Sequence, residues 1–189
     1  MLKVAVLVSG GGTNLQAILD AIDEGRITNA RVDVVISNNP GAYALERAKG
    51  HGIEALCVSP KDYESREAFN EAFLAMLDSY QVDLVVLAGF LVVIPEQMIA
   101  QYRNRIINIH PSLLPAFRGA HAIEQALEYG VKVFGVTIHY VNGELDGGRI
   151  IAQRAFEYLG SDPEELEARV HAVEHPLYVE TVAKLVAEQ

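Results

Sequence analysis

The stretch LKVAVLVSGGGTNLQAILDAIDEG, residues 2–25, places a strand-like run, a glycine-rich turn and a helix-like run in direct succession. Residues 2–9 are almost continuously apolar and partly β-branched, which favours a strand that is buried on both faces. Residues 14–25 repeat apolar side chains at helical spacing and end at Gly25, which predicts an amphipathic helix. A buried strand that leads through glycines into a helix is typical of an α/β fold built on a parallel sheet.

The same alternation extends outward along the chain. Strands are predicted at residues 31–38, 53–59, 83–89 and 105–110, and helices at 42–52, 65–80, after Pro95 and at 121–130. The helix at 65–80 carries one apolar stripe, formed by Phe69, Phe73, Met76, Leu77 and Tyr80. Since the predicted strands are apolar on both faces, we expect a mostly parallel sheet with helices on both faces.

The C-terminal part departs from this alternation. Residues 131–158 form two strand-like runs around a turn rich in Asn-Gly and Asp-Gly, which predicts an antiparallel addition near the sheet edge. Residues 162–189 predict a last helix that Asp162 caps and that Pro176 kinks or splits. No repeat, low-complexity tract or linker interrupts the chain, so we predict one domain over residues 1–189.

Composition narrows the classes of function. The formal net charge is −10, whereas a general nucleic-acid binder needs a basic face, so no nucleic-acid partner is expected. The longest apolar run, residues 84–95, is shorter than the roughly 20 residues of a membrane-spanning helix, so no membrane partner is expected either. The single cysteine, Cys57, fits a reducing cytoplasm and is predicted to be a buried structural thiol.

The glycine-rich turn suits a bound anion. Three consecutive glycines allow backbone N–H groups to converge on a ligand, and the N-terminus of the following helix favours negative charge. The turn lacks the lysine of a triphosphate-binding loop, and Leu15 stands where a dinucleotide-binding loop has its third glycine. We therefore predict a monophosphate site. The alternative is a tight strand-to-helix turn in which Thr13 or Asn14 caps the helix.

A polar pair ends the strand in IINIHPSLLPAF, residues 106–117. Asn108 and His110 point to the same face of this strand because side chains alternate, and the end of a parallel strand is where such sheets bind ligands. An amide that donates to an oxyanion beside an imidazole that handles a proton suits chemistry at a carbonyl. The later ELDGG turn offers Glu144 or Asp146 to orient the imidazole. The alternative is that these groups only satisfy the local backbone.

The remaining histidines are weaker candidates. No HExxH, CxxC or Cys/His cluster is present, so no metal is expected, and His171 and His175, one helical turn apart, are a weak metal signal by themselves. His139 lies in a strand and is predicted to be a hydrogen-bonded core or rim residue, and His51 a solvated helix end. His121 follows the proline-rich turn and is a better candidate for lining the cleft.

Together these segments resemble the phosphoribosylglycinamide formyltransferases, folate-dependent enzymes of purine biosynthesis. The matching segments span nearly the whole chain in the family's order: SGGGTNLQAI, SNNPGAYALERA, SREAF, VVLAGF, INIHPSLLPAF, GVTIHYV, ELDGG and VEHPLY. NIHPSLLP with a later DGG is specific to folate formyltransferases, and SGGGTNLQ to the ribonucleotide branch. The resemblance implies a Rossmann-like domain, with a phosphate-binding half at 1–110 and a folate and catalytic part at 111–189.

The resemblance also implies roles for individual residues. Gly12, Thr13 and Asn14 would bind the substrate phosphate with Gly11 shaping the loop, and Glu174 would hold the glycinamide end. The catalytic trio would be Asn108, His110 and Asp146. The co-substrate 10-formyltetrahydrofolate would contact Arg66, Asn108 and the backbone of Leu91, Val92, Val93 and Ile94.

The implied reaction is direct formyl transfer from 10-formyltetrahydrofolate to the amine of N1-(5-phosphoribosyl)glycinamide through a tetrahedral intermediate. The resemblance implies small-molecule partners, no metal, a cytoplasmic monomer or homodimer, and no nucleic acid or membrane. The alternatives are another folate-dependent enzyme that transfers or hydrolyses formyl groups, and a non-catalytic dinucleotide-binding module.

Overall fold

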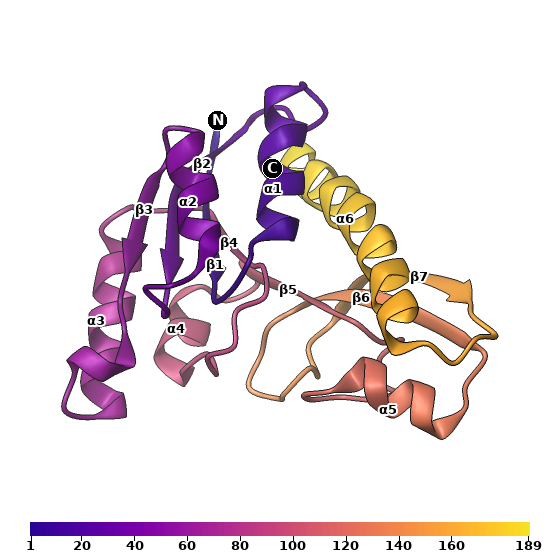
Figure 1. Ribbon diagram of the computed structural model, residues 1–189. Helices are drawn as coiled ribbons and strands as arrows, with labels where there is room; N and C mark the ends of the chain where they lie inside the picture. The colour runs from indigo at the N-terminus through magenta and orange to yellow at the C-terminus, as the bar shows by residue number, and fades with distance from the viewer.

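A seven-stranded sheet runs through the molecule in the order β3-β2-β1-β4-β5-β6-β7 (Figure 1). The computed structural model describes residues 1–189. The strands are β1 (Leu2–Val8), β2 (Ala30–Ser37), β3 (Glu54–Cys57), β4 (Leu84–Leu87), β5 (Ile106–His110), β6 (Val133–Tyr140) and β7 (Ile150–Glu157). The helices are α1 (Thr13–Asp23), α2 (Tyr43–Gly50), α3 (Arg66–Asp78), α4 (Glu96–Gln101), α5 (Ala122–Tyr129) and α6 (Pro163–Ala187), with a short 3-10 turn, η1 (Pro60–Asp62).

Strand pairing confirms the predicted fold class. Strands β1 to β5 pair in parallel, whereas β6 pairs antiparallel with β5 and β7 pairs antiparallel with β6. The antiparallel hairpin therefore forms one edge of the sheet, as the Asn-Gly and Asp-Gly turn between its two strands predicts. The fold is a mostly parallel α/β sheet with an antiparallel C-terminal addition.

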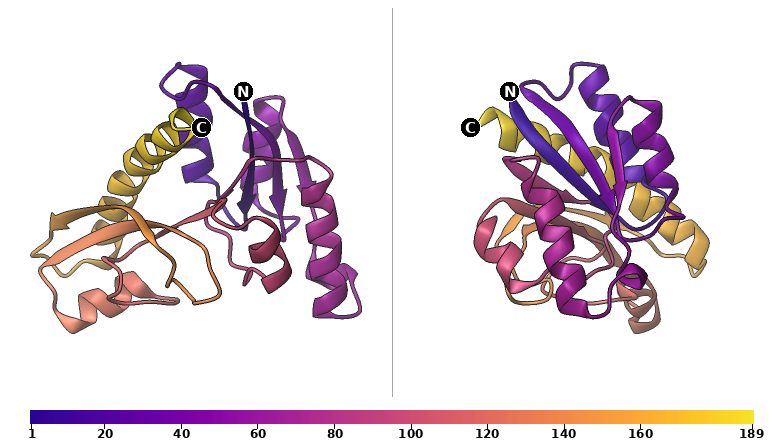
Figure 2. Two further views of the ribbon diagram at one scale, coloured as in Figure 1. Left: turned by 180° about the vertical axis from the view of Figure 1, so that it is seen from behind. Right: turned by 90° about the vertical axis from the view of Figure 1, so that its left-hand side faces the viewer.

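Both faces of the sheet are buried. On β1, Val4, Val6 and Val8 face one apolar core, and Ala5 and Leu7 face the other. Helices α1, α2 and α6 cover the first core, and α3 and α4 cover the second. The continuous apolar run of β1 is explained by this double coverage. Figure 2 shows α6 crossing from a position beside α1 to the strands β6 and β7, which it contacts.

The helices contradict one alternative interpretation of the sequence and one detail of the prediction. The N-cap of α1 is Gly12 in the left-handed conformation, with no side-chain hydrogen bond, so neither Thr13 nor Asn14 caps this helix. The apolar stripe of α3 is narrower than predicted: Phe69, Phe73 and Leu77 are buried, whereas Met76 is 36% exposed. The helix turns by about 100° per residue, which carries Met76 to the flank of the stripe.

The last helix, α6, agrees with its predicted cap and is not split. Asp162 caps α6, its carboxylate accepting from the backbone N–H of Glu164, as predicted. The helix continues through Pro176 without splitting, because the buried residues Val170 and Tyr178 hold both of its halves against the core.

The prediction of a buried thiol is wrong: Cys57 is exposed, because β3 is an edge strand with a neighbour on one side only.

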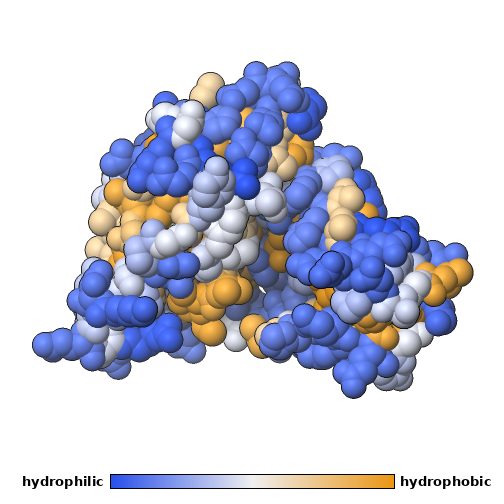
Figure 3. All heavy atoms as spheres, viewed as in Figure 1, coloured by the Kyte–Doolittle hydropathy of each residue, from blue (hydrophilic) through white to orange (hydrophobic).

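The fold brings the ends of several strands to one rim. Asn108 on β5 pairs with Leu87, the last residue of β4, and with His139 on β6. The surface is hollowed close to where β5 crosses the molecule (Figures 1 and 3). None of the helices is long and apolar enough to span a membrane.

Candidate active site

The carboxyl end of β5 carries a polar cluster. His110 is the last residue of the strand and is buried, and Asn108 is half-buried on the same side. Both belong to a strand whose isoleucines fill the cores, so the backbone beneath them is firmly held. The structure therefore places the amide and the imidazole together at the rim, as the alternation of side chains predicts.

Both ring nitrogens of His110 face oxygen atoms. Its Nε2 lies 2.8 Å from the carbonyl oxygen of Phe117, and its Nδ1 lies 3.6 Å from Oδ2 of Asp146. A carbonyl oxygen only accepts, so the Nε2 proton is donated to Phe117. The Nδ1 contact has the length of an ion pair rather than of a hydrogen bond. A doubly protonated imidazolium would satisfy both contacts.

The β6–β7 turn supplies Asp146, not Glu144, to this cluster. The Asp146 carboxylate accepts from the backbone N–H of Gly119 at 2.8 Å, which holds it beside His110. Glu144 is exposed. The glycines after Asp146 are needed for this turn, because a side-chain carbon at Gly148 would run into the backbone carbonyl of Tyr140. The structure thus resolves geometrically the choice that the ELDGG motif leaves open.

His139 completes the cluster and was not predicted as a site residue. It is 2% exposed, with Nε2 3.5 Å from Nδ2 of Asn108 and 3.8 Å from Oδ1 of Asp146. Burial lowers the pKa of His139, although its Nδ1 contact with the carbonyl of Tyr140 opposes this shift. A neutral His139 donates from Nδ1 to Tyr140 and leaves Nε2 free to accept from the Asn108 amide.

The glycine-rich turn forms a second polar site. Gly12 has a φ of 76°, and a side-chain carbon on it would lie 2.6 Å from Cβ of Ala44. A glycine is therefore required both by the backbone conformation and by the close approach of α2. Arg47 on α2 donates from Nε to the carbonyl of Gly11 at 2.6 Å. This arginine places a positive charge beside the turn, and the sequence motifs alone do not single it out.

Helix α6 faces the start of α1 at this second site. Glu174 is buried, and its Oε1 accepts from Nδ2 of Asn14 at 3.3 Å and contacts Nδ1 of His171 at 3.1 Å. His175 Nε2 lies 3.1 Å from the hydroxyl of Thr13. Five residues from two helices thus meet at the glycine-rich turn, although Asn14 and Glu174 are 160 positions apart in the chain.

The pKa values of the two histidines at this second site are shifted in opposite directions. The hydrogen bond to Glu174 raises the pKa of His171, whereas burial lowers the pKa of His175. The amide oxygen of Asn14 is buried and is the one side-chain polar atom of this kind without a hydrogen-bond partner. A buried acceptor without a partner is costly, which marks this point as a place for a ligand.

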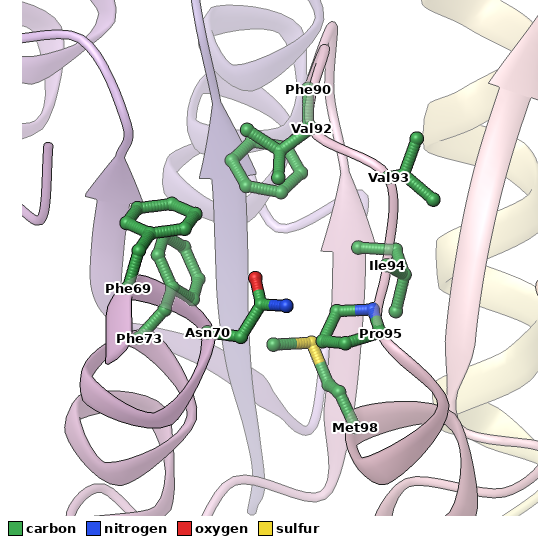
Figure 4. Close-up of a pocket in the computed structure, with 9 residues that line it drawn as sticks. All are labelled: Phe69, Asn70, Phe73, Phe90, Val92, Val93, Ile94, Pro95 and Met98. Atoms are coloured by element: carbon green, nitrogen blue, oxygen red, sulfur yellow. The ribbon is translucent and has the colours of Figure 1, made fainter. Parts of the chain in front are cut away.

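The loop after β4 lines a groove with Arg66. Leu91, Val92 and Val93 share this groove of about 400 Å³ with Arg66 at the start of α3. The neighbouring hollow, shown in Figure 4, is lined by Ile94 together with side chains of α3 and α4. Leu91 is 86% exposed and Val93 is 76% exposed. Exposed apolar side chains beside a cation suit a ligand with a flat apolar body and an anionic end.

The loop is tied to the sheet beside the other two sites. The hydroxyl of Ser9, at the end of β1, accepts from the backbone N–H of Leu91 at 2.9 Å. Because Leu87 pairs with Asn108, this loop leaves the sheet next to the catalytic candidates.

Comparison with known proteins identifies the family. The family model described as formyl transferase matches residues 2–182. The chain belongs to the formyl transferase family. Phosphoribosylglycinamide formyltransferase of Bacillus subtilis is 40% identical over 98% of this chain and 95% of that protein. The crystal structure of glycinamide ribonucleotide transformylase 1 from Symbiobacterium toebii superposes with a TM-score of 0.95 at 49% identity, covering 100% of this chain and 89% of that one.

Other relatives of this formyl transferase are much longer. The trifunctional purine biosynthetic protein adenosine-3 of Drosophila melanogaster is 44% identical over 97% of this chain, but the match spans 14% of that protein. Matches with phosphoribosylglycinamide formyltransferases over nearly the whole chain confirm the resemblance seen in the sequence motifs.

The formyl transferase fold brings most of the predicted site residues together, with one exception among the histidines. The side chain of His121 is 77% exposed and pairs with Glu124 at 3.2 Å, away from the His110 cluster. His51, predicted to be a solvated helix end, is instead half-buried at the end of α2 and lies 3.0 Å from the carboxylate of Asp23. His139 could have been found from the sequence only by pairing the two histidine-bearing strands in antiparallel register.

Proposed function

We propose that this formyl transferase carries the formyl group from 10-formyltetrahydrofolate to the amine of N1-(5-phosphoribosyl)glycinamide, a step of purine biosynthesis in the cytoplasm. The observation that carries the proposal is the convergence of Asn108, His110 and Asp146 at the end of β5. The names of relatives such as the Bacillus subtilis enzyme support the choice of substrates.

The proposed ribonucleotide site follows from the chemistry of the glycine-rich turn and of Glu174. The turn of Gly11 and Gly12, with Thr13 and Asn14, would hold the phosphate, because backbone donors at a helix start favour an anion. The Glu174 carboxylate, near the unpartnered oxygen of Asn14, would receive the glycinamide amine.

The groove of Arg66 and residues 91–94 would receive the folate. Its apolar side chains fit the ring systems, and the guanidinium fits the anionic tail. The phosphate turn lies within residues 1–110, as the expected division has it, but the folate groove, Asn108 and His110 also lie there. Residues 111–189 contribute Asp146 to catalysis and Glu174 to the ribonucleotide site.

The proposed chemistry is acyl transfer without a covalent enzyme intermediate. The substrate amine attacks the formyl carbon, Asn108 donates to the oxyanion that forms, and the positive charge of protonated His110 stabilises it. Asp146 stabilises the imidazolium and supports proton transfer through water. The bond from the formyl carbon to folate N10 then breaks, and the proton lost by the amine ends on N10.

Two substitutions test this assignment. His110→Ala and Asp146→Asn are expected to lower kcat by about 10²–10⁴-fold, the range of general acid–base and oxyanion contributions. Ribonucleotide affinity, measured by calorimetry, is expected to stay within a few-fold, because the phosphate turn is separate. Near-normal turnover in either variant would show that the catalytic assignment is wrong.

A further inference from the structure

Three side chains on one face of α6 have the composition of a metal site. His171, Glu174 and His175 stand at positions i, i+3 and i+4, and one nitrogen or oxygen from each lies within 4.8 Å of the others. The two imidazole rings are stacked at a centroid distance of 6.0 Å. Two histidines alone are a weak signal, but here a buried carboxylate lies between them.

Two of the three ligand atoms already have the spacing of a tetrahedral site. Zinc bonds of about 2.0–2.1 Å place neighbouring ligand atoms about 3.3 Å apart. The contact between Nδ1 of His171 and Oε1 of Glu174 is already 3.1 Å. The side chain of His171 is 44% exposed, and Nε2 of His175 lies 3.1 Å from the hydroxyl of Thr13, so an ion bound through this nitrogen would replace that contact.

A second observation also indicates a ligand here. Asn14 is 9% exposed, and its amide oxygen has no partner although its amide nitrogen donates to Glu174. An acceptor left unsatisfied at the edge of a His₂Glu set is compatible with a cation or with water bound to one. Glu167, whose Oε1 lies 3.5 Å from Nε2 of His171, adds further negative charge.

We propose that His171, Glu174 and His175 bind one divalent ion of the zinc class, and that the bound ion excludes the phosphorylated substrate. The two imidazole ligands favour zinc, nickel and copper over magnesium and calcium, and zinc also accepts a carboxylate. Three protein ligands leave one position open for water.

The exclusion of substrate follows from the shared carboxylate, and it rests on the proposed function. Glu174 would receive the substrate amine, and a metal ion on that carboxylate would cancel its charge and repel a cationic amine. The ion would thereby act as a reversible inhibitor competing with the ribonucleotide and not with the folate.

Calorimetric titration of the chelator-treated full chain with Zn²⁺ alone tests the metal site. We expect one ion per chain in the wild type and affinity lowered by more than about tenfold in His171→Gln. His175→Gln should lower the Zn²⁺ affinity independently of His171→Gln. Co²⁺ bound to the wild type should show the visible absorption of a tetrahedral site, and this absorption should disappear in both variants.

His121→Gln is the matched control, because His121 also pairs with a glutamate three residues later but has Gln125 in place of a second histidine. This variant should bind Zn²⁺ like the wild type. Absence of binding in the wild type, or equal binding in His171→Gln, would overturn the metal site.

Ribonucleotide titrations with and without Zn²⁺ test the exclusion. The apparent Kd of the ribonucleotide should rise in proportion to Zn²⁺ in the wild type and stay constant in His171→Gln. Equal ribonucleotide affinity in zinc-loaded wild type would overturn the exclusion and leave the metal site standing. No ribonucleotide binding in metal-free protein would overturn the proposed function and the exclusion together, whereas the Zn²⁺ calorimetry would still decide the site.

Discussion

At the scale of single residues, the candidate active site depends on which groups share the Asp146 carboxylate. One of its oxygens faces His110 and the other faces His139. The two imidazoles differ in their surroundings, since His110 contacts the Phe117 carbonyl and His139 contacts the Tyr140 carbonyl. We infer that His110 is the proton-handling group and that the neutral ring of His139 positions the Asn108 amide.

The lowered pKa of His139 predicts how stability depends on pH. Its pKa in the folded state lies below the ordinary value of 6.5, so the unfolded chain binds the proton more readily. The stabilisation from a neutral His139 is therefore complete above pH 6.5 and is lost as the pH falls through the folded-state pKa.

The measurement is the free energy of unfolding by urea from pH 8 to pH 5. We expect the wild type to lose more stability over this range than His139→Gln, whose side chain does not titrate. Parallel curves for the two proteins would show that the pKa of His139 is the same in the folded and unfolded states.

At the scale of elements, the junction of β1 and α1 depends on one glycine. Gly12→Ala should destabilise the fold by about 1–3 kcal/mol, the cost of a left-handed non-glycine residue, with the contact against Ala44 added. It should also weaken ribonucleotide binding, because the backbone donors of the turn would move.

Gly10→Ala is the control for this substitution. An added carbon at Gly10 meets nothing within 4 Å, and its φ is not positive. In thermal and urea unfolding, Gly12→Ala should be clearly less stable than Gly10→Ala. Equal stability of the two would contradict the account of the turn.

Helix α6 is fastened to the sheet by one buried hydroxyl. Tyr178 is completely buried and donates to the carbonyl of Leu87 at 2.7 Å, with the carbonyl of Ile107 at 3.3 Å. Burial raises the pKa of this tyrosine well above 10, so it stays a donor. This bond helps to hold Glu174, one turn earlier in α6, at the ribonucleotide site.

Tyr178→Phe should therefore lower the free energy of unfolding by about 1–3 kcal/mol, because buried carbonyls lose their donor. Tyr43→Phe serves as a control, since Tyr43 is 60% exposed. Urea unfolding measures both, and a Tyr178→Phe protein as stable as wild type would show that the hydroxyl contributes nothing.

At the scale of the whole molecule, the formal charge of −10 opposes an anionic substrate, so binding must come from local donors. The proposed ribonucleotide site lies between α1 and α6, which cover one face of the sheet, whereas the proposed folate groove includes Arg66 at the start of α3, which covers the other face. The ribonucleotide site joins residues from both halves of the chain. Ligands that bridge these parts should stabilise the whole fold.

A ligand at 100 times its Kd should stabilise by about 2.7 kcal/mol, which corresponds to a rise in Tm of about 5–10 °C for a chain of this length. Glycinamide ribonucleotide or a folate analogue should produce this rise in a thermal-shift assay, whereas NAD should not. A comparable shift with NAD would favour a dinucleotide-binding module instead.

The sequence by itself determined the fold class, the order of the elements, the antiparallel hairpin and the strand end that carries Asn108 and His110. These features depend on local apolar periodicity, on glycines and on short motifs, which adjacent residues encode. Only the tertiary structure decided that Asp146 and not Glu144 faces His110, that His139 joins them, that Asn14 meets Glu174 across 160 positions, and that Cys57 is exposed. These outcomes depend on which strands become neighbours and how α6 packs against α1, and no local pattern encodes such long-range contacts.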